Sequence, residues 1–431
     1  MNVFEKIHSR SMHVVVMGVG YVGLPLVAEF ARAGFRVTGL DKDARKVESL
    51  MRGVSYIDDV PTSDVAPHVL TGRLSATTDF GVLSEADAVV VCVPTPLNKS
   101  KDPDMQYIVA AADDIARRQR AGMLVVLEST TYPGTTSEVL VPRLTQGFSI
   151  GKEVFVAFSP ERVDPGNRVY KTKNTPKVLG GATPACLEVA HALYSTIIDR
   201  VVPVSSTETA EMVKLLENTF RAVNIGLVNE VAIMSRRLGV DPFEVISAAA
   251  TKPFGFMPFY PGPGLGGHCI PIDPLYLSWK LRSLKYAARF IELADAINSS
   301  MPGYVVERVA QALNASRKAI SGSRILLYGV AYKANVSDTR ESPALAIAYE
   351  LLQLGAEVSY MDPHVPAVNE EGLQLCAVEP NAAFSEYDVV VIVTNHAALD
   401  RGRLLREAQL IVDTRDALRG VAGDRSKVHG L

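Results

Sequence analysis

Cysteine is scarce in this chain, long apolar runs are absent, and both features exclude classes of protein. The four cysteines (Cys92, Cys186, Cys269 and Cys376) lie far apart, form no CxxC pair and have no histidine at the spacing of zinc ligands. This pattern argues against a disulfide framework and a structural metal, and it suits a reducing cytoplasm. No run approaches the roughly 18 apolar residues of a membrane helix, and the opening MNVFEKIHSR lacks the apolar segment of a signal peptide. We therefore expect a cytoplasmic protein with no metal and no membrane association.

An excess of positive charge is also missing. Lys and Arg total 44 and Asp and Glu total 47, so the charge balance gives no indication of nucleic acid as a partner. A hydrophobic content of 48% and a charged content of 21% are typical of globular proteins. A chain of 431 residues is long enough for two or three domains.

The first strongly patterned region is a strand–turn–helix–strand unit over residues 12–41. The apolar run MHVVVMGV is typical of a parallel strand covered on both faces. Gly18, Gly20 and Gly23 then form GxGxxG before the helical segment LPLVAEFARAG, and a second strand ends at Asp41. Such glycines allow close approach of a pyrophosphate to the helix N-terminus, and the aspartate binds ribose hydroxyls but repels a 2′-phosphate. The unit predicts NAD rather than NADP, and a tight turn without ligand is the alternative.

Polar residues follow the next strands of this region. VPTP (93–96) and ESTTYPGTT (128–136) each follow a buried strand, and SPERVDPGN (159–167) follows a third. Open α/β sheets bind ligands at the carboxyl ends of their parallel strands, although strand ends also need caps and turns. These segments are therefore candidates for binding a cofactor or a substrate.

A central all-α region follows the first sheet. Ser205 and Glu208 predict a capping box, and the next thirty or so residues contain a single glycine and no proline, as in a long helix. Lys214, Asn218 and Arg221 lie on one stripe of that helix. A cation beside an amide can stabilise a developing oxyanion, whereas the alternative is that the stripe is simply the solvated face.

The strand–turn–helix–strand pattern returns near the C-terminus. SRILLYGVAYK, PALAIAYELLQLG and AEVSYMDP repeat the order of the first unit, and the turn is longer by about the ten residues KANVSDTRES. We predict an α/β protein with two Rossmann-like, doubly wound parallel-sheet domains joined by a long central helix and an all-α region. The predicted domains are residues 1–204, 205–300 and 301–431.

The loop YPGPGLGGHCIPIDP, residues 260–274, carries the most informative cysteine. Glycine lets a backbone approach a ligand closely, and proline limits the freedom of the loop. Cys269 follows His268, and Asp273 comes four residues later. A buried structural cysteine is the alternative, but the other reactive residues of the chain favour a nucleophilic thiol.

Motifs along nearly the whole chain resemble the UDP-glucose/GDP-mannose dehydrogenase family. They are GVGYVGLP, CVPTP, EST, SPE, K-x-x-x-N-x-x-R, GGHCIPIDP and YK…DTRES, in that order. The resemblance implies oxidation of the C6 alcohol of a nucleotide sugar to a carboxylate with two NAD, which supplies polysaccharide precursors. It also implies an N-terminal NAD domain, a helical dimerisation centre, a C-terminal UDP-binding domain and a homodimer or higher homo-oligomer.

The resemblance assigns roles to individual residues. Cys269 would capture the aldehyde as a thiohemiacetal and then carry a thioester, with Lys214 and Asn218 stabilising the oxyanion. Thr130, Glu161 and Asp273 would position or activate water. The residues implied in cofactor binding are Gly18, Gly20, Tyr21, Val22, Gly23, Asp41, Arg45, Pro94, Thr95, Thr130 and Arg340. The residues implied in substrate binding are Glu161, Arg162, Val163, Lys214, Asn218, Arg221, Gly266, Lys333 and Arg415.

Within the family, SPERVDPGN and PGPGLGGHCIPIDP are similar to the N-acetylhexosamine branch, above all to UDP-N-acetylglucosamine 6-dehydrogenases. UDP-glucose enzymes have a Glu where this chain has Pro165 and a Lys where it has Ile272. The first of these loops offers Arg162 and Asn167 to an acetamido group. UDP-N-acetylmannosamine, UDP-N-acetylgalactosamine, UDP-glucose and GDP-mannose stay open as alternatives. Lys252 is the candidate substitute for an arginine that the family supplies from the partner subunit.

Two other classes of protein share parts of this pattern. A hydroxyacid or 6-phosphogluconate-type dehydrogenase also joins a Rossmann domain to a helical one, but it needs neither a nucleophilic cysteine nor a second Rossmann unit. A non-catalytic nucleotide-binding protein on the same fold would be expected to lack Cys269 or Lys214, and both are present.

Overall fold

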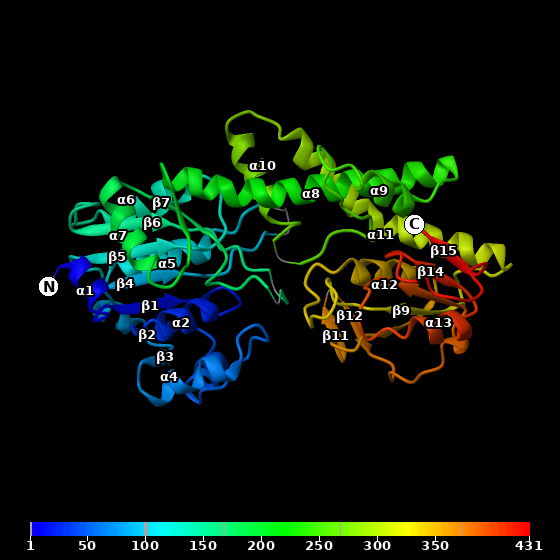
Figure 1. Ribbon diagram of the computed structural model, residues 1–431, viewed down its shortest axis with the longest axis horizontal. Coiled ribbons are helices and arrows are strands. Elements are labelled where there is room, and N and C mark those ends of the chain that lie inside the picture. The colour runs from blue at the N-terminus through cyan, green and yellow to red at the C-terminus, as the bar shows by residue number, and fades with distance from the viewer. Residues whose placement is uncertain (1, 99–101, 165, 168, 268, 371) are drawn as a thin grey trace. The chain divides into compact units, whose positions relative to one another are not determined.

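The computed structural model describes residues 2–98, 102–164, 166–167, 169–267, 269–370 and 372–431 (Figure 1). Pro165 and His268, on which parts of the sequence analysis depend, lie outside the described residues. The chain forms two compact units. The first consists of Met1–Glu217 and Leu275–Tyr286, and the second of Asn218–Pro274 and Ala287–Leu431.

An eight-stranded sheet forms the centre of the first unit, in the order β3-β2-β1-β4-β5-β6-β7-β8. The strands are β1 (His13–Met17), β2 (Arg36–Leu40), β3 (Leu74–Thr77), β4 (Ala88–Val91), β5 (Met123–Leu127), β6 (Val154–Phe158), β7 (Lys177–Gly181) and β8 (Val201–Val204). Neighbouring strands are parallel except that β7 runs antiparallel to β6. Because β1 lies between β2 and β4, the strand order reverses there, at the switch point where such sheets bind ligands.

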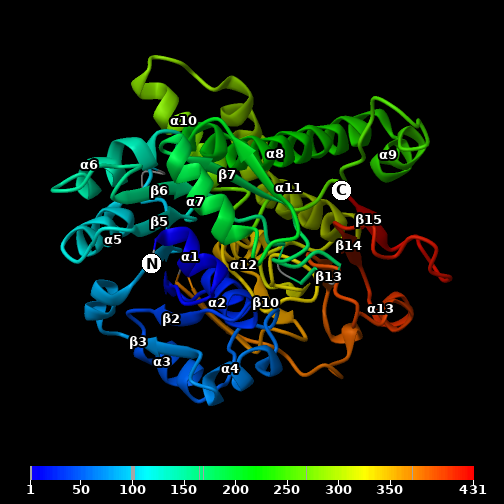
Figure 2. The same cartoon turned by 60° about the vertical axis from the view of Figure 1, so that its left-hand side comes forward.

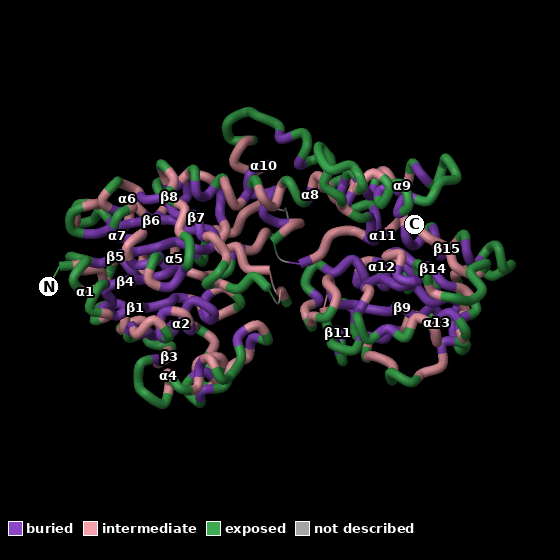
Figure 3. The backbone as a smooth tube through the Cα atoms, in the orientation of Figure 1, coloured by how far each residue is buried: buried purple, intermediate pink, exposed green. Residues whose placement is uncertain are grey.

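Helices cover both faces of this sheet (Figures 1 and 2). They are α1 (Val3–His8), α2 (Gly23–Arg32), α3 (Ala44–Met51), α4 (Ala66–Leu70), α5 (Gln106–Ala116), α6 (Val141–Leu144) and α7 (Pro184–Tyr194). Val14 and Val16 of β1 pack in one core with residues of α1, α2 and α7, whereas Val15 and Met17 pack in another with residues of α5 and α6. Burial on both faces explains the continuous apolar runs, and Figure 3 shows buried residues along these strands.

A five-stranded parallel sheet forms the centre of the second unit, in the order β10-β9-β13-β14-β15. The strands are β9 (Arg324–Tyr328), β10 (Glu357–Met361), β13 (Val389–Ile392), β14 (Ile411–Asp413) and β15 (Val428–Gly430), and β11 (Ala367–Glu370) pairs separately with β12 (Leu373–Cys376). Helices α11 (Arg289–Ala315) and α12 (Pro343–Gln353) pack on one face and α13 (Arg401–Glu407) on the other. The predicted pair of Rossmann-like parallel sheets is confirmed.

The long central helix is also confirmed, but its predicted cap is wrong by one residue. Helix α8 (Thr207–Leu238) contributes residues to both units. The backbone N–H of Thr209 donates to Ser206 Oγ at 3.1 Å. Ser205 lies in the bend between β8 and α8, so it comes too early to cap the helix.

The rest of the central region also contains helices. Helices α9 (Pro242–Ala249) and α10 (Asp273–Ser283) follow α8. Helix α11 continues through Pro302, so the boundary predicted at residue 300 falls inside a helix. In the part of the chain that the structure describes, no helix has both the length and the apolar character needed to cross a bilayer.

Candidate functional site

The glycine turn between β1 and α2 leaves room for close approach of another group. Gly18 has a φ of +91°, and a Cβ there would lie 2.5 Å from the Cys92 carbonyl oxygen. A Cβ at Gly23 would overlap the carbonyl oxygen of Gly18, whereas one at Gly20 would meet nothing within 4 Å. Gly18 and Gly23 are therefore required for the backbone of the turn to pack closely. The space beside Gly20, next to the first turn of α2, is unfilled by protein atoms. This arrangement fits the pyrophosphate of a dinucleotide.

Asp41 is held beside this turn at the end of β2. Its Oδ2 accepts from the Val19 N–H at 3.0 Å, and its Oδ1 accepts from the Asp43 N–H at 2.9 Å. Arg45, which was predicted to bind the cofactor, forms an exposed ion pair with Asp43. Other residues predicted to bind the cofactor follow β1 (Tyr21 and Val22) and β4 (Pro94 and Thr95). Tyr21 and Pro94 are exposed, Val22 is half-buried and Thr95 is buried.

A buried carboxylate from α8 fixes the loop that follows β5. Glu211 accepts hydrogen bonds from the backbone N–H groups of Gly134 (2.6 Å) and Thr136 (2.8 Å) and from the Thr136 hydroxyl (2.7 Å). Burial raises the pKa of Glu211 to about 7. Thr130 lies half-buried in this loop. The role of Glu211 was not predicted, because no sequence pattern indicates a contact between α8 and residues 134–136.

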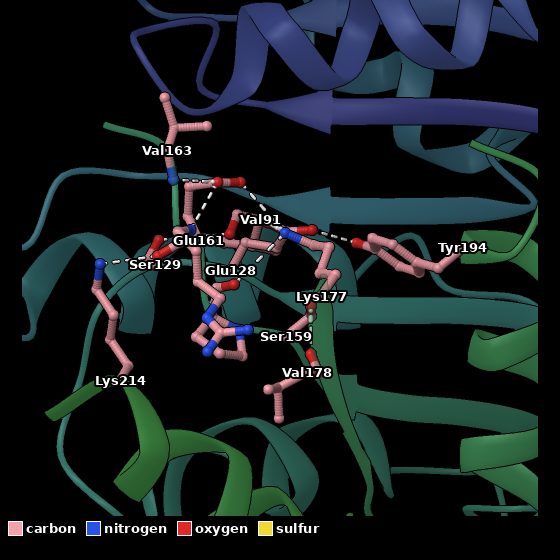
Figure 4. A network of polar contacts seen from close by, with 12 residues as sticks. Val91, Glu128, Ser129, Ser159, Glu161, Val163, Lys177, Val178, Tyr194 and Lys214 are labelled. Atoms are coloured by element: carbon pink, nitrogen blue, oxygen red, sulfur yellow. Dashed lines mark hydrogen bonds and ion pairs between the residues drawn. The ribbon is translucent and has the colours of Figure 1, made fainter. Parts of the chain in front are cut away.

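A buried ammonium joins the ends of β5 and β6 to the start of β7 (Figure 4). The Nζ atom of Lys177 lies 2.7 Å from Glu128 Oε2 and 3.2 Å from Glu161 Oε2, and its side chain is 5% exposed. The Tyr194 hydroxyl donates to the other oxygen of Glu128. Lys177 was not predicted as a site residue, although a lysine at the start of an apolar strand is an available signal.

The two carboxylates around Lys177 differ in their proton affinity. Burial raises the pKa of Glu128 to about 7 against the opposing effect of the Lys177 charge. Burial has the same tendency at Glu161, but the Lys177 ammonium and the Arg162 N–H outweigh it and lower the pKa. The same carboxylates outweigh the desolvation of Lys177 and raise the pKa of its ammonium. Lys177 and Glu161 are therefore both charged at neutral pH.

Glu161 faces two ways. Its Oε1 accepts from the backbone N–H groups of Arg162 (2.7 Å) and Val163 (2.8 Å), while Oε2 faces Lys177. Its backbone carbonyl accepts from Lys214 Nζ at 2.7 Å. Figure 4 shows Lys214 reaching this segment from α8, on the side away from Lys177. The loop that begins SPE thus connects the buried ion pair to a predicted catalytic lysine.

Side chains farther along this loop are held within the first unit. The Arg162 Nε lies 3.2 Å from Glu217 Oε2, and its Nη1 donates to the Pro176 carbonyl at 2.7 Å. Asn167 Nδ2 donates to Asp164 Oδ2 at 3.2 Å. Arg162 and Asn167, which the sequence analysis offered to an acetamido group, therefore have partners in the protein.

In the second unit, the cysteine that was predicted to be reactive, Cys269, lies close to the start of α10. Cys269 is exposed, and its carbonyl accepts from the Asp273 N–H at 2.8 Å. Asp273 is buried, and its Oδ2 accepts from Asn218 Nδ2. Asn218 lies one turn after Lys214 on α8, and Arg221 is exposed on the next turn. Asn218, Asp273 and the backbone of Cys269 are thus linked by hydrogen bonds.

The glycines before the cysteine pack against the long turn of the second Rossmann repeat. The Gly267 N–H donates to the Arg340 carbonyl at 2.9 Å. A Cβ at Gly266 would lie 2.7 Å from the Cβ of Tyr332. The guanidinium of Arg340 pairs with Asp338 at 2.6 Å. The long turn of the second repeat, from Tyr332 to Arg340, therefore contacts the glycines of the cysteine loop.

Three other predicted cations belong to the second unit. The guanidinium of Arg415 lies so close to Gly262 that a Cβ there would overlap it. Burial lowers the pKa of Arg415 to about 10, which leaves it protonated at neutral pH. Lys333 is half-buried in the long turn, and the Lys252 ammonium lies 5.0 Å from the centre of the Phe254 ring. Among the described residues, no group of three or more His, Cys, Asp or Glu could hold a metal ion.

The comparison with known families agrees with this geometry. Models of the UDP-glucose/GDP-mannose dehydrogenase family match the chain in three parts: the NAD binding domain at residues 12–198, the central domain at 208–300 and the UDP binding domain at 326–420. The chain belongs to this family. It is an NAD-dependent nucleotide-sugar dehydrogenase.

Relatives of this dehydrogenase are named for several sugars. It is 35% identical to a UDP-N-acetyl-D-glucosamine 6-dehydrogenase of Pseudomonas aeruginosa, over 90% of this chain and 91% of that protein. It is 36% identical to an NDP-N-acetyl-D-galactosaminuronic acid dehydrogenase of Ralstonia nicotianae, over 93% and 95%. The structure of a UDP-D-ManNAc dehydrogenase from Pyrococcus horikoshii has a TM-score of 0.88 and 31% identity, covering 97% of this chain and 99% of that one.

Asp41 should determine the choice between NAD and NADP. We expect the wild type to use NAD strongly in preference, and Asp41→Asn to raise kcat/KM for NADP relative to NAD by about tenfold, roughly 1.4 kcal/mol, because repulsion of the 2′-phosphate is removed. Steady-state rates at matched cofactor concentrations measure this ratio. Glu48→Gln is the control, because it also removes one negative charge, at an exposed position of α3. Equal kcat/KM for the two cofactors in the wild type would show that Asp41 does not face the ribose.

Packing at Gly266 should control the cysteine loop. Gly266→Ala places a methyl group against Tyr332, so we expect kcat to fall by about tenfold or more, ~1.4 kcal/mol in the activation barrier. The affinity for NADH, measured by fluorescence titration, should stay near that of the wild type, because the glycine turn is untouched. Gly303→Ala is the control, since its new Cβ would have no neighbour closer than 3.6 Å. Full kcat in Gly266→Ala would contradict the dependence of the loop on this contact.

Proposed function

We propose that this dehydrogenase oxidises the C6 alcohol of UDP-N-acetylglucosamine to the uronate in two successive two-electron steps. The observation that carries the chemistry is the exposed Cys269 on a loop fixed by its glycines. Cys92 and Cys186, the two cysteines of the first unit, are poorly placed for such a role. Cys186 is buried, and burial together with Glu128 raises the pKa of the Cys92 thiol well above its ordinary value.

The proposed role of Cys269 is covalent capture of the aldehyde. NAD bound at the glycine turn supplies an acceptor for the hydride that leaves C6. Cys269 Sγ, as the thiolate, adds to the C6 aldehyde and forms a thiohemiacetal. Loss of a second hydride from this adduct, for which a second NAD would be the acceptor, leaves a thioester, which water hydrolyses to the carboxylate and the free thiol. Capture explains how one site completes two oxidations without releasing a reactive aldehyde.

The remaining predicted residues have supporting roles in this proposal. Lys214 and Asn218 stabilise the oxyanion at C6, and Lys214 is also the proposed acid/base. Thr130 and Asp273 orient water for hydrolysis. The Glu161 carboxylate already accepts from Lys177 and two N–H groups, which supports a positioning role for it. Residues proposed to hold the sugar and its UDP are Arg162, Val163, Arg221, Gly266, Lys333 and Arg415, while Arg340 is proposed for the cofactor.

Cys269→Ser should separate the two oxidations. The wild type should produce two NADH per sugar, and the variant should form the uronate at least about a hundredfold more slowly, because an alcohol is a much weaker nucleophile than a thiolate. NADH absorbance together with chromatography of the sugar product measures both quantities. Cys376→Ser replaces another exposed cysteine and should behave as the wild type does. Full four-electron activity in Cys269→Ser would refute the covalent route.

The sugar is proposed from the sequence of the loops and from the relatives. N-acetylated glucosamine, mannosamine and galactosaminuronic acid appear in the names of similar proteins. An N-acetylated sugar therefore has more support as the substrate than any particular N-acetylated sugar. Ile272, which is buried, stands where UDP-glucose enzymes have a lysine. A site that binds an amide should reject the analogue without one, since polar groups of the protein would be left unpaired.

A panel of nucleotide sugars tests this assignment. The panel consists of UDP-N-acetylglucosamine, UDP-N-acetylmannosamine, UDP-N-acetylgalactosamine, UDP-glucose and GDP-mannose. We expect kcat/KM to be highest for the first of these. The advantage over UDP-glucose should be about a hundredfold, ~2.7 kcal/mol, if an amide-binding group loses its partner. A preference for UDP-glucose over every N-acetylated sugar would overturn the assignment but leave the chemistry intact.

We also propose that the enzyme is a homodimer or a higher homo-oligomer. Large apolar side chains are exposed along α8 in the single chain, namely Leu216, Phe220, Leu227, Met234 and Leu238. Burying such a row against a second copy would be favourable. Light scattering at micromolar concentration should give a dimer or a multiple of one. A fully active monomer would contradict the proposal.

A further inference from the structure

Lys177 is placed unusually for a lysine. It is the first residue of β7, whose residues are all buried, and it is the only charged one among them. Its ammonium lies within 3.5 Å of three oxygens, those of the Glu128 and Glu161 carboxylates and of the Pro160 carbonyl. A buried ammonium without such partners would lose its proton. These oxygens come from two different loops, one after β5 and one after β6. The Lys177 ammonium therefore holds both loops in place.

The contacts continue from Lys177 to α8. The Glu161 carboxylate accepts hydrogen bonds from Lys177 and from two backbone N–H groups. These contacts determine the orientation of the Glu161 peptide group. The carbonyl of that residue accepts from Lys214 Nζ at 2.7 Å. All of these contacts lie within the first unit.

We propose that Lys177 is a positioning residue for Lys214: by fixing the Glu161 segment through its carboxylate, it orients the carbonyl that holds the Lys214 ammonium. The proposal rests on the proposed function only in giving Lys214 a role at C6. Its structural part, the dependence of Lys214 on Lys177, holds for any substrate.

A purely stabilising role does not account for this arrangement. Burying one ammonium between two carboxylates has a large desolvation cost, and apolar residues of similar volume often stabilise a core as well or better. Lys177 pairs across the sheet with Val201, and the residues that follow it on β7 are buried and uncharged. The charge gives the Glu161 loop a defined position, which an apolar side chain would not.

Chemical labelling tests the structural part without any substrate. Lysines are acetylated with limiting acetic anhydride, and the labelled fraction of Lys214 is measured by peptide mass spectrometry relative to exposed Lys152. Lys177→Met, which keeps the length of the side chain and removes its charge, should raise Lys214 labelling several-fold. Lys177→Arg should leave it near the wild-type value, since the charge is kept. Lys6→Met is the matched control, because it removes the Lys6–Asp87 ion pair from the same unit.

Kinetics and a double variant separate positioning from stability. In Lys177→Met, kcat should fall about tenfold or more while the Kd for NADH is unchanged. Glu128→Gln with Lys177→Met removes a buried carboxylate that the single variant leaves without its ammonium, so Tm should recover. Lys214 labelling and kcat should not recover, because Glu161 still lacks its anchor. If the single variant cannot be purified, the double variant carries the same test.

Two results would overturn the proposal. One is unchanged Lys214 labelling in a folded variant that lacks the Lys177 charge. The other is a double variant that regains kcat together with Tm, since this would make Lys177 a stabilising residue only. If Lys214 labelling responds as expected but no nucleotide sugar is oxidised, the proposed function fails and the dependence of Lys214 on Lys177 stands.

Discussion

One ammonium shared by two buried carboxylates determines the positions of the strand ends in the first unit. The Lys177 side chain is almost fully enclosed, so its contacts with Glu128 and Glu161 are not exchanged for water. Moving either loop would take away one of the two carboxylates that compensate the buried ammonium, which is more costly than breaking a surface ion pair. Glu211 acts similarly from α8, where it holds the loop that contains Thr130. Buried carboxylates therefore fix the polar loops that are proposed to carry chemistry.

The cysteine loop in the second unit is fixed by a different means. Gly266 and Gly267 lie so close to Tyr332 that a side chain at either position would collide with it. The loop therefore has its backbone packed on the long turn while the Cys269 side chain stays exposed. A nucleophile needs such a combination, since it must be accessible to substrate and yet held in one place. The second Rossmann repeat supports that loop in addition to its expected role with the nucleotide.

Features that depend on local sequence were predictable, and features that depend on long-range contacts were not. The glycine fingerprint with Asp41, the two sheets and the long helix all follow from patterns within short segments, and the structure agrees with them. The capping residue was misplaced because one residue more or less in a strand-to-helix turn leaves no mark in the sequence. Lys177 and Glu211 were missed because their partners are distant along the chain. Arg162 was predicted to bind the substrate, and its pairing with Glu217 could not be read from the sequence.

Covalent capture by Cys269 is the central claim, and trapping the adduct tests it most directly. The enzyme is mixed with NAD and UDP-N-acetylglucosamine, quenched in acid during turnover, digested, and its peptides are weighed by mass spectrometry. The account predicts that the peptide containing Cys269 gains the mass of the uronyl group of the nucleotide sugar, and that the adduct disappears on treatment with hydroxylamine, which cleaves thioesters. Turnover to the uronate with no adduct on that peptide in a quench fast enough to sample a single turnover, or with an adduct on another cysteine, would contradict it.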